Sequence, residues 1–488
     1  MELERAFRKR ARASGGGGPD RLSALPDCIL HVIMSFMKAR QAVQTCVLSK
    51  RWRYLWHSVP CLDIDFDEFK KTACASDDGA GSGGKDYYGS DDDVSYTDSD
   101  RSDSNLDSSD ASDYIDRHRH RHRHRHRDRG RDRDSDRDKY KYKDWEAFED
   151  FAVSLMHHRN IAQLDSFRLD IVGSRAPEFG DRRAAGWLRR AMKYCIPDRA
   201  NQRFGLSSGS WLLKRLHLGH VLLDNRFMKQ VRSVCRSLQD LQLDDCSCQI
   251  QSITSKSLKT LVLRNCRWRN LSKIISPTLN TLVIDGFSST DDCVLVIVAP
   301  AVAYLHLDVH VEHFSGGISI NEVTSLAKAS IRLQCHRYES FRSKLCGDQI
   351  KLLCSLSTVT SLELSDVRAT VLGKKHTFLE FKNLRNLLLG NCDLSDNFHI
   401  LVFFLQSSPI LEKITLRCCE FPKYSYSKKG TAKLNKTSSS ELRGLDLLCE
   451  NLKVEIIYKR GYGPHLLHNL LRISVNLSKN NIKLTKVN

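Results

Sequence analysis

Histidines and cysteines are the side chains of this sequence with the greatest capacity for chemistry. His306, His310 and His313 are four and three residues apart, a spacing at which three imidazoles could ligate a metal ion. They lie around a predicted strand, so we interpret them as polar surface. Five further histidines, from His118 to His126, alternate with arginines in a segment where no geometry fixes four ligands. We therefore predict no metal site and no cofactor.

The cysteines point to structure rather than to metal binding. The chain has 17 of them but no C-x-x-C pair. Cys246 with Cys248, and Cys418 with Cys419, each lack the second pair that a zinc site needs. We expect free, mostly buried thiols in a reducing compartment, namely the nucleus, the cytoplasm or both.

Motifs that position a nucleophile or a phosphate are not found in a suitable context. This holds for the P-loop, G-x-S-x-G, H-E-x-x-H and the strand-borne dinucleotide fingerprint. The string GSGGK, residues 81–85, is followed by Asp86 and lies in a polar tract, so it is no phosphate loop. We therefore expect a binding protein without catalytic residues.

The elements that would position a binding surface begin with residues 20–69. Pro26 suits a helix start, and apolar residues then recur at helical spacing from Leu30 to Met37. Residues 42–48, and a segment capped by Ser49, predict two further short helices. A unit this small is marginal alone, so we expect it to pack on the rest of the chain or on a partner.

Three strings in this module resemble the F-box of plant proteins. LPDCILHVIMSFM (25–37) resembles its first helix, AVQTCVLSKRWRYLW (42–56) its second half and SVPCLDIDFDEF (58–69) its exit strand. The resemblance implies docking on a Skp-type adaptor, which tethers the chain to a cullin and a RING subunit. The family's adaptor-docking and core positions fall on Leu25, Pro26, Ile29, Leu30, Ile33, Val43, Val47, Leu48, Trp52 and Trp56.

Residues 70–143 predict a disordered low-complexity insertion. They are rich in Asp, Ser and Gly, then in Arg with His and Asp, and hold too few apolar residues to fold. Helical spacing resumes at Trp145, so the segment reads as an insertion in a surface loop. We favour a solvated insertion whose two halves attract each other. Metal binding, nucleic-acid binding and phosphorylation at serines such as Ser99, Ser102 and Ser109 are the alternatives.

One pattern, L-x-x-L-x-L, returns from residue 161 onward, often with Cys three residues later. Its first positions are mostly 20 to 27 residues apart. They are Leu164, Leu213, Leu238, Leu258, Leu279, Val302, Leu326, Val359, Leu384 and Leu411. This is the period of leucine-rich repeats, in which each unit is a short parallel strand plus a returning helix or loop. The strings WLRRAMKYCIPD, SLAKASIRL and ENLKVEIIYKRG also resemble parts of plant F-box/leucine-rich-repeat proteins.

The side chains beside the repeated leucines are the candidate target-binding residues. Because a strand alternates with period two, leucines that point inward leave their neighbours on the concave sheet face. That face mixes apolar, acidic and basic groups, which favours a protein ligand over nucleic acid. The substrate-binding candidates are His217, Gln242, Val262, Val283, His306, Glu363, Leu388 and Thr415. Binding on loops or a rim is the alternative.

The sequence as a whole predicts an α/β fold with five parts. A basic tail (1–19) precedes the F-box module of three helices (20–69), the disordered insertion (70–143), a leucine-rich-repeat solenoid with a parallel sheet (144–450) and a closing segment (451–488). The implied function is substrate recognition for an SCF-type ubiquitin ligase, with an unknown target protein and no membrane contact. The formal net charge of +18 keeps a nucleic-acid-associated basic scaffold protein as the alternative function.

Overall fold

The computed structural model describes the chain in a series of segments. They are residues 22–69, 132–158, 164–171, 187, 213–289, 294–310, 318–334, 352–366, 380–421, 452–458 and 481–487, apart from a few positions within these ranges. The predicted tail and residues 70–131 of the predicted insertion lie outside the described residues. In the described parts, no helix is both long and apolar enough to cross a membrane.

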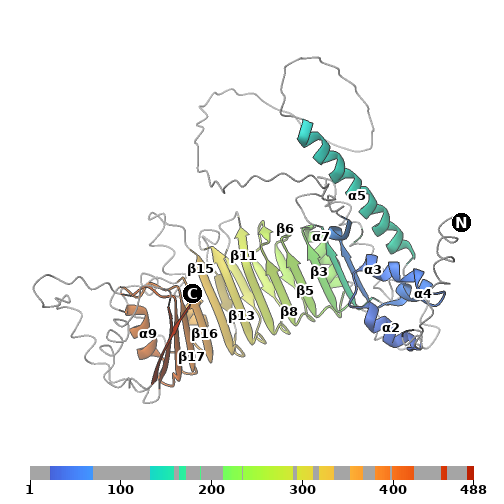
Figure 1. Ribbon diagram of the computed structural model, residues 1–488. Helices are drawn as coiled ribbons and strands as arrows, with labels where there is room; N and C mark the ends of the chain where they lie inside the picture. Colours follow the sequence, from blue (N-terminus) through green and yellow to red (C-terminus); the bar gives the residue numbers. More distant parts are fainter. Residues whose placement is uncertain are drawn as a thin grey trace, which may run out of the picture. The chain divides into compact units, whose positions relative to one another are not determined.

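The N-terminal module is a group of short helices (Figure 1) that enclose a small core. Its elements are α2 (Asp27–Met34), α3 (Ala39–Gln44), η1 (Thr45–Val47), α4 (Trp52–Leu55) and η2 (Trp56–Ser58). The core consists of Leu30, Met34, Ala42, Trp52, Leu55 and Val59. Arg51 Nε donates to Asp27 Oδ1 over 2.8 Å and so ties the approach to α4 to the start of α2. The prediction of three helices is confirmed, although the second begins at Ala39 rather than at Ala42.

The main sheet is parallel throughout its long path, as the repeat pattern predicted. The strand order is β1-β2-β3-β5-β8-β11-β13-β15-β16-β17-β18-β19-β20, and each strand pairs with the next in parallel. The bounds are β1 Cys61–Asp65, β2 Ser166–Asp170, β3 Arg215–Gly219, β5 Asp240–Asp244, β8 Thr260–Arg264, β11 Thr281–Ser289, β13 Tyr304–His310, β15 Lys328–Gln334, β16 Ser361–Ser365, β17 Asn386–Gly390, β18 Lys413–Arg417, β19 Lys453–Tyr458 and β20 Ile482–Lys486.

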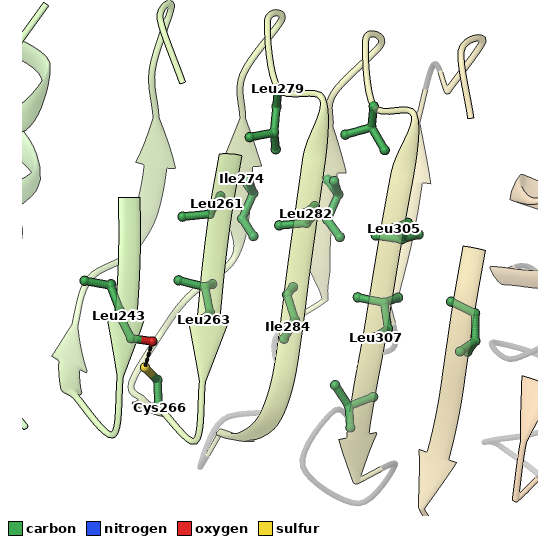
Figure 2. Packing of buried hydrophobic residues seen from close by; sticks show 14 of the residues in the cluster. Leu243, Leu261, Leu263, Cys266, Ile274, Leu279, Leu282, Ile284, Leu305 and Leu307 are labelled. Carbon is green, nitrogen blue, oxygen red and sulfur yellow. Dashed lines mark hydrogen bonds between the residues drawn. The ribbon is translucent and has the colours of Figure 1, made fainter. Parts of the chain in front are cut away.

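The repeated leucines form the core behind this sheet. Leu261 pairs in register with Leu241 and Leu282, and the row continues to Leu305. These side chains are buried, and Figure 2 shows Leu261, Leu282 and Leu305 side by side on successive strands. Because the stacking repeats at every strand, one continuous apolar layer runs along the sheet.

The returning segments are mostly short strands, where helices or loops were expected. A second parallel sheet has the order β14-β12-β10-β7, with β7 Ser252–Thr254, β10 Lys273–Ile275, β12 Leu295–Val298 and β14 Ile318–Asn321. Repeats of 20 and 21 residues leave little room for a helix, and β-branched residues such as Ile253 and Ile274 favour strands. Ile274 points from β10 toward the leucine core (Figure 2). Other returns contain the short strands β4 (Leu222–Asp224), β6 (Ser247–Gln249) and β9 (Arg267–Trp268) and the helices α7 (Asn225–Ser233) and α9 (His399–Ser407).

The turns after the strands repeat as well. His220, Asp245, Asn265, Asp366 and Asn391 each follow a strand directly and have positive φ, between 49° and 60°. Asn and Asp tolerate this left-handed conformation because their short polar side chains bond the local backbone. The chain therefore leaves these strands of the main sheet through the same type of turn.

Strand β1 and helix α5 (Asp132–His158) join the module to the sheet. β1 leaves the module and pairs with β2 from Cys61 with Ser166 to Asp65 with Asp170. Phe66 follows in η3 (Phe66–Phe69) and packs on α5, with ring centroids 5.5 Å from Trp145 and 5.0 Å from Phe148. The described residues of module and sheet therefore belong to one compact unit.

Helix α5 begins earlier than predicted, at Asp132 instead of after Lys143. The expectation that the insertion stays unfolded up to residue 143 is therefore wrong for its last residues. The sequence offers a reason, because acidic residues stand three positions before basic ones, as in Asp134 and Arg137, a spacing that supports a helix. The predicted helical spacing from Trp145 onward is confirmed.

Candidate functional site

The first candidate surface is a second apolar face on α2. Leu30 and Met34 point into the module core, whereas Ile29, Val32 and Ile33 are exposed. Phe36, just after the helix, is 86% exposed. These four residues are three or four positions apart and so share one side of the helix, which we call the docking face.

Two more exposed apolar residues follow α3. Val47 ends η1, Leu48 comes next, and both side chains are largely in solvent. Tyr54 in α4 is exposed too. So many large apolar side chains on a module of this size indicate a protein-binding surface, since monomeric proteins rarely leave such groups open.

The structure divides the ten predicted adaptor residues. Pro26, Ile29, Ile33, Val47 and Leu48 are exposed and remain candidates for docking. Leu25 and Trp56 are partly buried against the module core, and Val43 packs against the sheet core. Leu30 and Trp52 cannot contact a partner, because they are 0% and 5% exposed within the module core. The resemblance gave docking and core positions together, and Leu30 and Trp52 are core positions.

Sequence reasoning missed three members of this surface, Val32, Phe36 and Tyr54. For α2 a signal was present. Ile29, Val32, Ile33 and Phe36 form a second apolar stripe beside the one that begins at Leu30. When one apolar stripe of a helix packs on the core, the other is either exposed to solvent or buried against a partner protein.

The second candidate surface is the face of the main sheet opposite the leucine core. All eight predicted target-binding residues lie in one row across this face, at the third position of each strand, and we call it the middle row. In order, the middle row holds His217, Gln242, Val262, Val283, His306, Ser330, Glu363, Leu388, Thr415 and Glu455. Ser330 was missed because its repeat, around Leu326, matches the pattern loosely.

Two members of the middle row are not open to solvent. Val262 and Thr415 are each only 8% exposed, although both lie on the predicted face of the sheet. Side chains on neighbouring strands lie about 4.8 Å away. A short β-branched side chain is therefore covered by its longer neighbours, such as Gln242 beside Val262. The other predicted residues are partly exposed.

Polar contacts concentrate on the strands nearest the module. His217 Nε2 lies 2.5 Å from Asp244 Oδ2, and Gln242 Nε2 donates to the same oxygen over 2.8 Å. Burial opposes ionisation of Asp244, but the bonds from His217 and Gln242 outweigh it and lower the pKa of that carboxyl. His220 Nδ1 lies 3.0 Å from Asp170 Oδ1, and this bond raises the pKa of His220. These side chains hold one another in fixed positions.

The cysteines of the repeats are structural, as predicted. Cys246, Cys266 and Cys419 are buried, and each Sγ donates to a strand carbonyl, as from Cys266 to Leu243 over 3.4 Å (Figure 2). Burial raises the pKa of the neighbouring Cys248 thiol. Among the residues that the structure describes, no group of three or more His, Cys, Asp or Glu could hold a metal ion. His118 to His126 and His313 lie outside those residues.

Comparisons with known proteins agree with the first surface. The family model of the F-box domain matches residues 22–63. The MEIOTIC F-BOX protein MOF of Oryza sativa is 29% identical over 487 residues, covering 93% of this chain and 83% of that protein. F-box/LRR-repeat protein 13 of Arabidopsis thaliana is 43% identical over 63 residues, which is 13% of this chain and 14% of that protein. An F-box/FBD/LRR-repeat protein of the same plant is 52% identical over 52 residues, or 11% and 12%. The matches to these two Arabidopsis proteins are therefore short.

Proposed function

Because this chain belongs to the plant F-box protein family, we propose that it is the substrate-recognition subunit of an SCF-type ubiquitin ligase. The main support for this proposal is that the matched F-box segment, residues 22–63, contains the exposed apolar docking face. In this proposal the docking face, with Val47 and Leu48, binds a Skp-type adaptor. The adaptor then links the chain to a cullin and a RING subunit in the nucleus or the cytoplasm.

The sheet is the target-binding part in this proposal. Its repeat period, its parallel strands and its continuous leucine core support a leucine-rich-repeat solenoid. The partly exposed side chains of the middle row would contact the target protein. The chain then needs no nucleophile, because it acts by holding a target lysine close to a charged ubiquitin carrier.

Adaptor capture by the full chain tests the docking face. Phe36→Asp places a charge where an apolar contact is proposed, and Phe36 is so exposed that the fold should not change. Co-purification with a Skp-type adaptor should fall at least about tenfold, which corresponds to roughly 1.4 kcal/mol.

Ile410→Asp is the matched control, since Ile410 is also an exposed apolar residue but lies before β18. It should leave adaptor capture unchanged. Equal capture by wild type and by Phe36→Asp would contradict the proposed interface, and no capture by wild type would contradict the proposed function.

The net charge of +18 supports a second candidate, a nucleic-acid-associated basic scaffold. Gel shifts with RNA and DNA over a range of salt concentrations distinguish the two. Contacts to phosphates alone weaken steeply with salt. A tight complex at physiological ionic strength, together with no adaptor capture, would favour the scaffold.

A further inference from the structure

The open sheet face carries opposite charges at its two ends. On strands β1 to β13 carboxylates predominate, and we call these the acidic end: Asp65, Asp170, Asp240, Asp244, Asp285 and Asp308. Three arginines lie among them. Each already has an acidic partner, Arg168 with Asp63, Arg215 with Asp165 and Arg264 with Asp244. Asp65 also pairs with Lys38, and Asp308 pairs with Arg332 of β15. Among the described residues, the carboxylates left without an ion-pair partner at this end are Asp240 and Asp285.

Basic side chains predominate from β15 to β20. We call these the basic end: Lys328, Arg332, Lys413, Arg417, Lys453 and Lys483. The acidic residues of the same strands on this face are Glu363 and Glu455. Lys413 Nζ lies 2.9 Å from Glu455 Oε2, and Lys483 Nζ lies 3.3 Å from the other oxygen of that carboxylate. Arg332 pairs with Asp366 and Asp308, and Arg417 pairs with Glu363. The remaining positive charge lies on Lys328, on Lys453 and on the two lysines that share Glu455.

Between the two ends, the middle row contains apolar side chains and no charged ones. Val262 and Val283 are neighbours on β8 and β11, where the row has no charge. A segment lying across the strands would thus meet acidic, then apolar, then basic side chains.

We propose that this face binds a segment of the target protein whose own charges run in the opposite order. Its basic residues lie over the strands nearest the F-box, its apolar residues over the uncharged stretch at the partly exposed Val283, and its acidic residues over β15 to β20. This proposal rests on the function proposed above and adds to it the chemistry and the orientation of the target. Complementary charge mainly sets orientation and partner choice, whereas apolar contacts supply affinity.

The spacing of the strands gives the length of such a segment. From β5 to β18 the path has seven strand-to-strand steps. At about 4.8 Å a step, this is roughly 34 Å. An extended segment of about ten residues or a helix of about twenty would span it.

Block peptides test the charge order on the full-length chain. One probe has a run of lysines, a few valines and a run of glutamates, about twelve residues in all. A second has the blocks in reverse order, and a third has the same composition with the charges mixed. By fluorescence anisotropy at low ionic strength, at least one block peptide should bind about tenfold tighter than the mixed peptide. A photo-crosslinker at the lysine end should label β1 to β13, and one at the glutamate end should label β15 to β20.

Charge reversal at each end supplies matched variants. Asp240 and Asp285 have no ion-pair partner among the described residues, so Asp240→Lys with Asp285→Lys breaks no pair seen in the structure. This change should weaken block-peptide binding about tenfold. Adding Lys328→Glu and Lys453→Glu, at two exposed positions, should restore binding and exchange the ends that cross-link. Melting curves confirm that the variants fold.

Three results would overturn this proposal. They are equal binding of block and mixed peptides, the same cross-linked strands whichever end of the peptide carries the photo-crosslinker, and unchanged peptide binding after charge reversal. Binding of oligouridine that is lost with Lys328→Glu and Lys453→Glu, with no peptide bound, would assign the face to nucleic acid instead. Adaptor capture is measured on the same samples. If the peptide test fails while adaptor capture is intact, only the proposed charge order is contradicted. If adaptor capture fails while the block peptides bind, only the proposed ligase function is contradicted.

Discussion

Replacing Phe66 by Ala should loosen the joint between module and sheet. The ring is fully buried and packs edge-on against Trp145 and Phe148 at 5.5 and 5.0 Å. Truncating a buried Phe to Ala costs about 3–5 kcal/mol, from lost transfer energy and the cavity that remains. Aromatic pairs contribute about 0.5–1.5 kcal/mol each beyond area, so we expect the upper half of that range.

Urea unfolding of the full chain, followed by tryptophan fluorescence, measures this loss, and Trp145 itself reports on the cluster. Tyr54→Ala is the control, since it removes an aromatic ring that is exposed, and it should change the free energy of unfolding by less than about 0.5 kcal/mol. Adaptor capture should persist in Phe66→Ala, because Phe66 is not part of the module core. A loss below about 1 kcal/mol would refute the packing described for this joint.

Three further predictions concern the sheet and the insertion. Leu261→Ala should lower the free energy of unfolding by about 2–5 kcal/mol, and Val262→Asp should also lower the melting temperature because it buries an unpaired carboxylate. An unchanged melting temperature for Val262→Asp would contradict the burial of that residue. The pKa of His220 is raised by Asp170, so this pair stabilises the fold fully below about pH 6.5, and the contribution is lost as pH rises through the folded pKa of His220. The pKa of Asp170 is lowered by the same bond, so stability is also lost as pH falls through that value. The difference in urea midpoint between wild type and His220→Gln should therefore shrink above neutral pH, and growth with pH would count against the pair. Deleting residues 76–131 should leave melting temperature and adaptor capture nearly unchanged, because long surface insertions cost little. Extending the deletion to residue 143 removes the first turns of α5 and should lower the melting temperature, as scanning fluorimetry would measure.

The sheet could be predicted from the sequence because its signal is local and repeated. Each L-x-x-L-x-L unit fixes which side chains of a strand point inward, and the period aligns the units. The same rule correctly put Gln242 and His306 in one row. It could not foresee that Val262 is covered, because exposure depends on the sizes of neighbours that are distant in sequence.

The docking surface was predicted less well, for a different physical reason. Periodicity shows that Leu30 and Ile33 are both apolar and helical, but it does not show which stripe of a two-striped helix meets the core. That choice is made by packing of α2 against α4, through Trp52 and Leu55. The hydrogen bond between His220 and Asp170 could not be predicted from the sequence either, because it joins residues 50 positions apart.

Strand β1 links the two proposed surfaces through a single element. It begins after only two residues, Val59 and Pro60, beyond η2 of the module, and it pairs with β2 along its whole length. If the module holds the adaptor and the sheet holds the target, no flexible linker separates them. A flexible linker would spread the target over a large volume and lower the effective concentration of its lysine at the ubiquitin carrier. Here each step along the sheet moves a bound segment by a fixed distance of about 4.8 Å from the module. The strand over which the target binds would therefore decide which of its lysines comes within reach.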